Sequence, residues 1–119
     1  MNFELTSPIY VGGFAIDVED ATKELTDRGL WGFFSLPLSK IQMRTDLTEQ
    51  AQAQTLVHEV IHAIENVYLE GDELTERQVA ALSQGLFQVI VDNPNFIDAI
   101  VEATSDACES ESPSSTTES

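Results

Sequence analysis

The chain has 119 residues and a formal net charge of −16 at pH 7, with 42% hydrophobic residues and one cysteine. This length predicts one domain with a modest core. The charge argues against a nucleic acid partner, because such a surface repels phosphates. The single Cys108 excludes an internal disulfide and favours a reducing, cytoplasmic compartment. The sequence shows no signal peptide and no apolar run near ~18 residues, so we expect neither secretion nor a membrane partner.

The N-terminal third is typical of strands joined in hairpins. Short apolar runs at residues 3–5, 9–11 and 14–18 predict strands. Gly12-Gly13 separates the last two runs and predicts a two-residue hairpin turn.

A short helix and a second hairpin are expected next. Residues 21–28 favour a helix that ends at Gly29. Residues 31–35 and 40–45 predict two further strands. The aromatic residues of the first of these strands are expected mainly to pack, with a wall beside a substrate as the alternative.

Residues 40–45 alternate between apolar and polar side chains, as in a half-exposed edge strand. Ile41 and Met43 are the apolar members of this pattern. An edge strand can pair with an extended peptide. The simpler interpretation is that both side chains pack on a neighbouring helix.

A long helix is predicted from about residue 48 to residue 69, with Asp46 and Glu49 at its N-terminal cap. A second helix follows over 75–92, where Thr75 and Gln78 form a capping-box pattern. Its apolar stripe consists of Val79, Ala80, Leu82, Leu86, Val89 and Ile90.

Pro94 ends the second helix, and a short third helix is expected to close the core. Its apolar residues are Phe96, Ile97, Ile100 and Val101. We expect one domain over residues 1–104 and a disordered acidic tail over 105–119, since the tail is almost entirely Ser, Thr, Glu and Pro. The predicted fold class is α+β, with a small antiparallel sheet of hairpins packed on the long helix and on a following antiparallel helix.

The long helix contains His58-Glu59-Val60-Ile61-His62, which matches the pattern HExxH. Residues four apart project from one face of a helix, so both imidazoles can bind one ion. Glu59 lies one position further round the helix and is placed to act as general base on a water bound to zinc. The pattern therefore predicts hydrolysis of a peptide bond by a zinc enzyme.

The residues around this pattern are aliphatic, which indicates a helix buried on nearly every side. Two imidazoles and a carboxylate are costly to bury without polar partners, and a metal ion is such a partner. The alternative is a pair of core histidines bonded to the backbone or to carboxylates.

The residues after His62 leave the third ligand open. A third histidine on the same helix is excluded, because Tyr68 occupies its position in the extended pattern and Glu65 occupies that of the required glycine. Glu76, at the start of the second helix, is our choice, with Glu73 and Glu65 as alternatives. Glu65 lies three residues after His62, so it also suits the role of acceptor for an imidazole N–H.

The runs Thr55 to Glu65, Glu76 to Leu86 and Asp92-Asn93-Pro94 resemble the small phage and prophage metallopeptidase-like proteins related to the ImmA/IrrE group. The resemblance covers roughly residues 29–100. It implies a zincin-like fold, Zn²⁺ as cofactor and a glutamate of the next helix, here Glu76, as third ligand.

The expected function is that of a phage-encoded zinc metallopeptidase acting on a protein or peptide. A non-catalytic accessory protein that keeps the zinc fold and binds another protein is the alternative. An acidic decoy that mimics DNA is a third hypothesis, in which the HExxH pattern would have no role. No Lys or Arg occurs between Arg44 and Arg77, so this segment attracts cations and basic peptides, although solubility alone also explains such acidity. The sequence predicts no particular oligomeric state.

Overall fold

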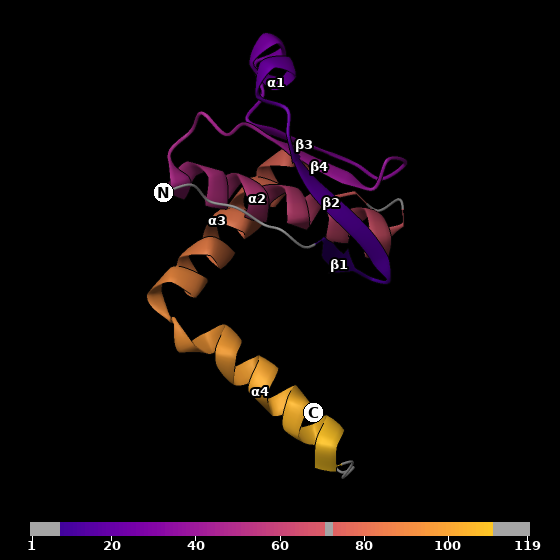
Figure 1. The fold of residues 1–119 in the computed structure, drawn as a ribbon, viewed down its shortest axis with the longest axis vertical. Helices are drawn as coiled ribbons and strands as arrows, with labels where there is room; N and C mark the ends of the chain where they lie inside the picture. The colour runs from indigo at the N-terminus through magenta and orange to yellow at the C-terminus, as the bar shows by residue number, and fades with distance from the viewer. Residues whose placement is uncertain (1–7, 71–72, 111–119) are drawn as a thin grey trace. The chain divides into compact units, whose positions relative to one another are not determined.

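The computed structural model describes residues 8–70 and 73–110, with side chains described as far as Ser105 (Figure 1). The chain divides into two compact units, residues 1–87 and 88–119. The boundary predicted after residue 104 stays a prediction. The strand predicted at residues 3–5 lies outside the described residues. Within the described ranges, no helix combines the length and the apolar character needed to cross a membrane.

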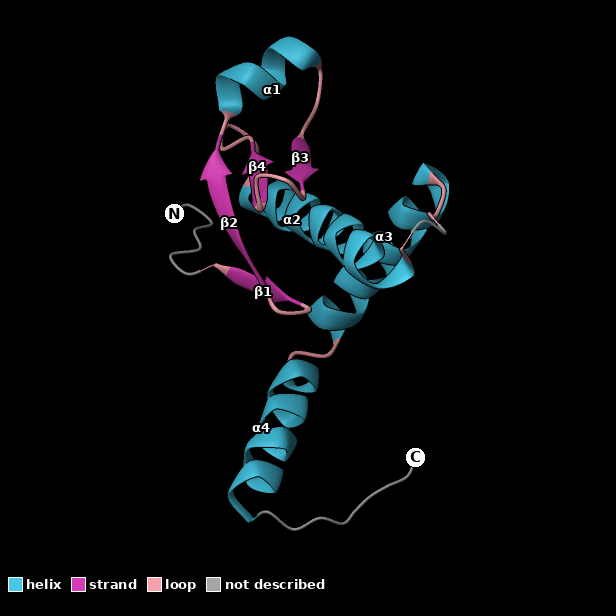
Figure 2. Cartoon of the chain, turned by 90° about the vertical axis from the view of Figure 1, so that its right-hand side faces the viewer, coloured by secondary structure: helices cyan, strands magenta, loops and turns pink. Residues whose placement is uncertain are grey.

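The first unit contains a four-stranded sheet in the order β1-β2-β4-β3 (Figure 2). Strands β1 (Ile9–Val11) and β2 (Phe14–Asp20) form the first predicted hairpin. Gly12 and Gly13 have φ values of 54° and 90°, which a tight hairpin turn of this kind requires. Strands β3 (Gly32–Ser35) and β4 (Lys40–Met43) form the second predicted hairpin.

The sheet is mixed, so the prediction of an antiparallel sheet was wrong in one pairing. β2 pairs with β4 in parallel, from Asp17 opposite Lys40 to Asp20 opposite Met43. Between these strands the chain passes through α1 (Thr22–Arg28) and then along β3. Because two parallel strands need such a crossover, a simple chain of hairpins is not formed. As predicted, α1 ends at Gly29, whose φ is 70°.

The edge strand also differs from the prediction. β4 lies inside the sheet, between β2 and β3, and its Ile41 and Met43 are buried. Their alternation with polar residues reflects packing in the core against α2 (Glu49–Ile64), which is the simpler interpretation given above. The edge strands are β1 and β3, and β3 also packs on α2.

The long predicted helix is present as α2, followed by a π-helical segment η1 (Glu65–Leu69). Thr48 caps α2, since its Oγ1 accepts the N–H of Ala51 at 3.1 Å. The predicted cap at Asp46 was wrong, because this carboxylate pairs with Arg44 at 2.8 Å. The core formed between the sheet and α2 contains Val11, Ile16, Ile41, Met43, Leu56 and Ala63.

Helix α3 (Glu76–Asp92) begins with the predicted capping box. The N–H of Gln78 donates to Thr75 Oγ1 at 3.0 Å, and Gln78 Oε1 accepts the N–H of Thr75 at 2.9 Å. Two backbone N–H groups at the start of the helix, which have no acceptor within it, are therefore hydrogen-bonded. This local structure fixes where α3 starts and so where Glu76 lies.

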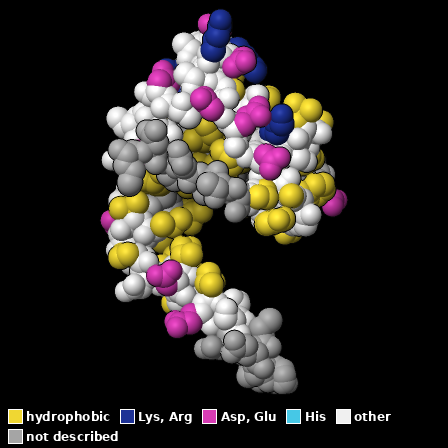
Figure 3. All heavy atoms as spheres, in the orientation of Figure 1, with side chains coloured by type: hydrophobic (Ala, Val, Ile, Leu, Met, Phe, Trp, Pro, Cys, Tyr) yellow, Lys and Arg dark blue, Asp and Glu magenta, His cyan; other side chains and the backbone are white. Residues whose placement is uncertain are grey.

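The second unit contains α4 (Asn95–Ser110), which is longer than the predicted third helix. Residues 105–110, predicted to belong to the tail, are helical, and residues 111–119 lie outside the described residues. The expectation that this helix closes the core stays a prediction. Its apolar side chains are exposed between acidic ones (Figure 3), namely Phe96, Ile97, Ile100 and Val101.

Candidate metal centre

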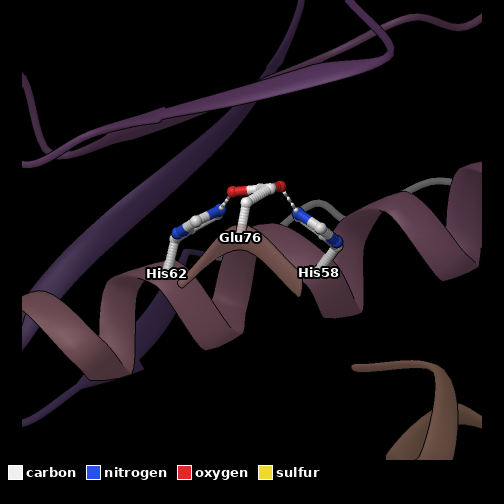
Figure 4. Close-up of side chains that lie close together, drawn as sticks. All are labelled: His58, His62 and Glu76. Atoms are coloured by element: carbon white, nitrogen blue, oxygen red, sulfur yellow. Dashed lines mark hydrogen bonds and ion pairs between the residues drawn. The ribbon is translucent and has the colours of Figure 1, made fainter. Parts of the chain in front are cut away.

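His58, His62 and Glu76 come together at one point of the first unit (Figure 4). Glu76 Oε2 lies 2.9 Å from Nε2 of His58, and Glu76 Oε1 lies 3.3 Å from Nε2 of His62. The ring centroids of the histidines are 5.0 Å apart. One ligand atom from each residue lies within 4.8 Å of the other two, so the three can converge on a single ion.

The second ring nitrogen of each histidine has its own partner. His58 Nδ1 lies 3.4 Å from Ser83 Oγ, and His62 Nδ1 lies 3.2 Å from Oε1 of Glu65. The Ser83 hydroxyl donates to the carbonyl of Ala80 at 3.1 Å, which leaves its oxygen free to accept an N–H from His58. Both Nδ1 atoms are thus occupied, while both Nε2 atoms face Glu76, as in histidines that bind metal ions.

This donor set suits zinc. Two imidazole nitrogens and one carboxylate oxygen are the ligands of many catalytic zinc sites, which keep a further position open. The His58 and His62 side chains are 24% and 26% exposed, so they are not fully enclosed core histidines. Glu76 is 71% exposed, and its carboxylate contacts both rings.

The other candidate ligands lie elsewhere. Glu65 is turned toward Nδ1 of His62, on the side of the ring away from Glu76. Glu73 is exposed and stands outside the group of converging ligand atoms. Of the three carboxylates considered from the sequence, the structure therefore brings Glu76 to the space between the two Nε2 atoms.

Glu59 lies on α2 between the two histidines and is only 6% exposed. Burial raises the pKa of its carboxyl above the ordinary value of 4.5. The neighbouring His62 and His58 act in the opposite direction, and the nearby Glu76 adds to the increase in pKa. A carboxylate whose pKa is raised is better suited to accept and return a proton.

Two hollows border the centre. One of about 360 Å³ extends to Trp31 and Ser83, and one of about 460 Å³ extends to Phe33 and Asn66. Both are lined by His58, Glu59 and Glu76, together with Gly32 of β3. A ligand can therefore approach the two histidines and Glu59 along the edge strand.

Ser83 and Gly32 were not singled out from the sequence. Ser83 follows Glu76 by seven residues, which places both on one face of α3. A Cβ on Gly32 would lie 2.6 Å from Thr55 Cγ2 and 3.3 Å from Glu59 Cγ, so glycine permits β3 to approach α2 at the site. A glycine inside a strand pattern is a signal of such close contact.

Comparisons with protein-family models, with curated proteins and with solved structures find no match to this chain. The resemblance to the ImmA/IrrE group stays a prediction. The candidate centre is defined by its own geometry.

Proposed function

We propose that the protein is a zinc-dependent metallopeptidase with a minimal zincin-like fold, in which His58, His62 and Glu76 hold the ion. The observation that carries the proposal is the convergence of these three side chains, with Nδ1 of each histidine occupied by another partner. A set of surface carboxylates does not produce this arrangement, in which both imidazoles present the same nitrogen to one point.

The roles of the residues follow from their positions. Zinc, when bound, lowers the pKa of a water toward about 7 and polarises a carbonyl group. Glu59 accepts a proton on its carboxylate from the attacking water and donates it to the nitrogen of the leaving amine. Its position beside both histidines and its raised pKa support this role.

The substrate would lie along β3. An edge strand presents backbone groups that can pair with an extended peptide, and β3 borders both hollows at Gly32. The acidic residues around the site favour peptides that carry basic side chains.

Metal content tests the proposed site. The purified protein should contain about one zinc per chain. His58→Ala should lose it, because only two of the three protein ligands would remain. Glu73→Gln is the matched control, since it removes an exposed carboxylate from the segment just before α3 and should keep the metal. Equal metal content in wild type and His58→Ala would contradict the proposed site.

Cleavage tests the proposed activity. Glu59→Gln should retain zinc and lose hydrolysis of a peptide library, by about 100-fold or more. Glu73→Gln should cleave as the wild type does. If Glu59→Gln cleaves normally, or if the zinc-loaded wild type cleaves nothing, the enzymatic proposal is wrong and the non-catalytic binding role becomes the better description.

A further inference from the structure

We infer that Glu65 is a positioning residue that couples His62 to the start of α3. Its one buried carboxylate fixes both the orientation of the His62 ring and the position of the segment that leads to Glu76. The inference rests on the proposed zinc site. Glu65 itself belongs to η1 and lies on the side of His62 that faces away from Glu76.

Both oxygens of Glu65 are used. Oε1 lies 3.2 Å from Nδ1 of His62, and Oε2 accepts the backbone N–H of Leu74 at 2.7 Å. The residue is only 6% exposed. A carboxylate is costly to bury unless its oxygens are bonded, so this burial indicates that the two contacts are maintained together.

The local helix geometry supports the arrangement. Glu65 follows His62 by three residues and therefore lies on the same face of the helix. The α-helix changes to a π-helix at this residue, and the Asn66 side chain donates to the carbonyl of His62 at 2.8 Å. Single π-helical turns are frequent at functional sites, where they alter the direction of side chains.

The contact with Leu74 connects this turn to the third ligand. Leu74 directly precedes Thr75, the residue that caps α3, and Glu76 is the first residue of that helix. Fixing the Leu74 amide therefore limits where α3 begins and where the Glu76 carboxylate lies. His58 has a comparable link, because its partner Ser83 belongs to α3 itself.

The chemistry requires a carboxylate at this position. When Glu65 accepts the Nδ1–H of His62, the Nε2 lone pair of the same ring is available for the ion. Glutamine has one acceptor oxygen, and its NH₂ group would meet a second donor, either the His62 Nδ1–H or the Leu74 N–H. Glu65→Gln therefore keeps the size of the side chain and loses one of the two bonds.

Zinc affinity, measured by competition with a chromophoric chelator, tests the coupling. Glu65→Gln should bind zinc about 10- to 100-fold more weakly than the wild type, as expected for loss of a ligand's outer partner. Glu73→Gln makes the same change at an exposed site nearby and should bind within about twofold of the wild type. Equal affinities of the two variants would overturn the inference.

The His62 Nδ1–H proton resonance of the zinc-loaded proteins separates positioning from mere support of the fold. It should be visible and protected from exchange in the wild type and in Glu73→Gln, and shifted or lost in Glu65→Gln. A weaker affinity with an unchanged resonance would also overturn the inference, because Glu65 would then act without orienting the ring.

Amide hydrogen exchange of the wild type, with and without zinc, tests the coupling without any variant, so the result does not depend on whether a variant folds. Zinc should slow exchange at the Leu74 amide, since coupling between two sites is reciprocal. The Leu38 amide, which also donates to a side-chain oxygen, is the control and should not change. An unchanged rate at Leu74 would contradict the coupling alone, whereas a wild type that takes up no zinc would remove the proposed function and this inference with it.

Discussion

Helices α2 and α4 are both 16 residues long, yet they differ in burial: α2 buries five side chains, whereas every described side chain of α4 is exposed. The buried residues of α2 include three polar ones, Gln52, Thr55 and Glu59. The large apolar residues of α4 are between 41% and 55% exposed, and these are Phe96, Ile97, Ile100 and Val101. The apolar pattern of a helix therefore does not by itself predict which of its side chains are buried.

The polar residues of α2 are buried because each has a structural or chemical task. Gln52 donates to the carbonyl of Leu47 at 2.8 Å and so holds the chain that leads into the helix. Thr55 packs under Gly32 at the closest approach of β3. Glu59 lies in the candidate centre, between the histidines. The buried polar residues of α2 therefore indicate the candidate site, whereas polar residues of a helix usually indicate its solvent-exposed face.

The largest predicted effect compares one apolar residue from each helix. Leu56→Ala should lower the free energy of unfolding by about 2–4 kcal/mol, because Leu56 belongs to the core cluster. Ile100→Ala should lower it by less than about 0.5 kcal/mol, as expected for an exposed side chain. Urea denaturation of both variants measures the difference. A loss at Ile100 as large as that at Leu56 would show that α4 is part of the folded core.

A smaller effect is expected where β3 meets α2. Gly32→Ala should destabilise the protein by about 1–3 kcal/mol, since the added Cβ would lie 2.6 Å from Thr55 Cγ2. Gly85→Ala, at an open position of α3, is the matched control and should stabilise by up to about 1 kcal/mol. Thermal denaturation distinguishes the two signs, and a neutral Gly32→Ala would mean that β3 does not require this close approach.

Local signals in the sequence predicted most elements of the fold. The Gly12-Gly13 turn, the end of α1 at Gly29 and the Thr75–Gln78 capping box are each determined by neighbouring residues, so they could be identified without the structure. The parallel pairing of β2 with β4 joins strands that lie far apart in the chain, and no local pattern specifies it. For the same reason the sequence predicted β4 as an edge strand, whereas β3 occupies that edge of the sheet.

The candidate site divides in the same way. The spacing of His58 and His62 is a property of one helix and is visible in the sequence. Which carboxylate reaches the two histidines depends on how the start of α3 lies against α2. The sequence alone therefore left Glu73 and Glu65 as alternatives to Glu76. Ser83 and the Glu65–Leu74 bond were missed as parts of the site because they join segments whose contact only the fold provides.

The smallest predicted effect concerns the cost of burying Glu59 in α2. Its pKa is raised in the folded protein, so between the unfolded and folded pKa values the folded state keeps a proton that the unfolded state has lost. Stability therefore falls as the pH rises through this window, and the cost is fully present above it. Glu59→Gln removes this cost, so the zinc-free variant should be more stable than the zinc-free wild type near pH 8, and the difference should shrink toward about pH 5. Urea denaturation with a chelator across this range measures it, and a difference that stays constant with pH would mean that the Glu59 carboxyl titrates alike in both states. Such a result would mean that the charged Glu59, the proposed general base, does not lower the stability of the folded protein. The two helices would then differ only in how their side chains pack.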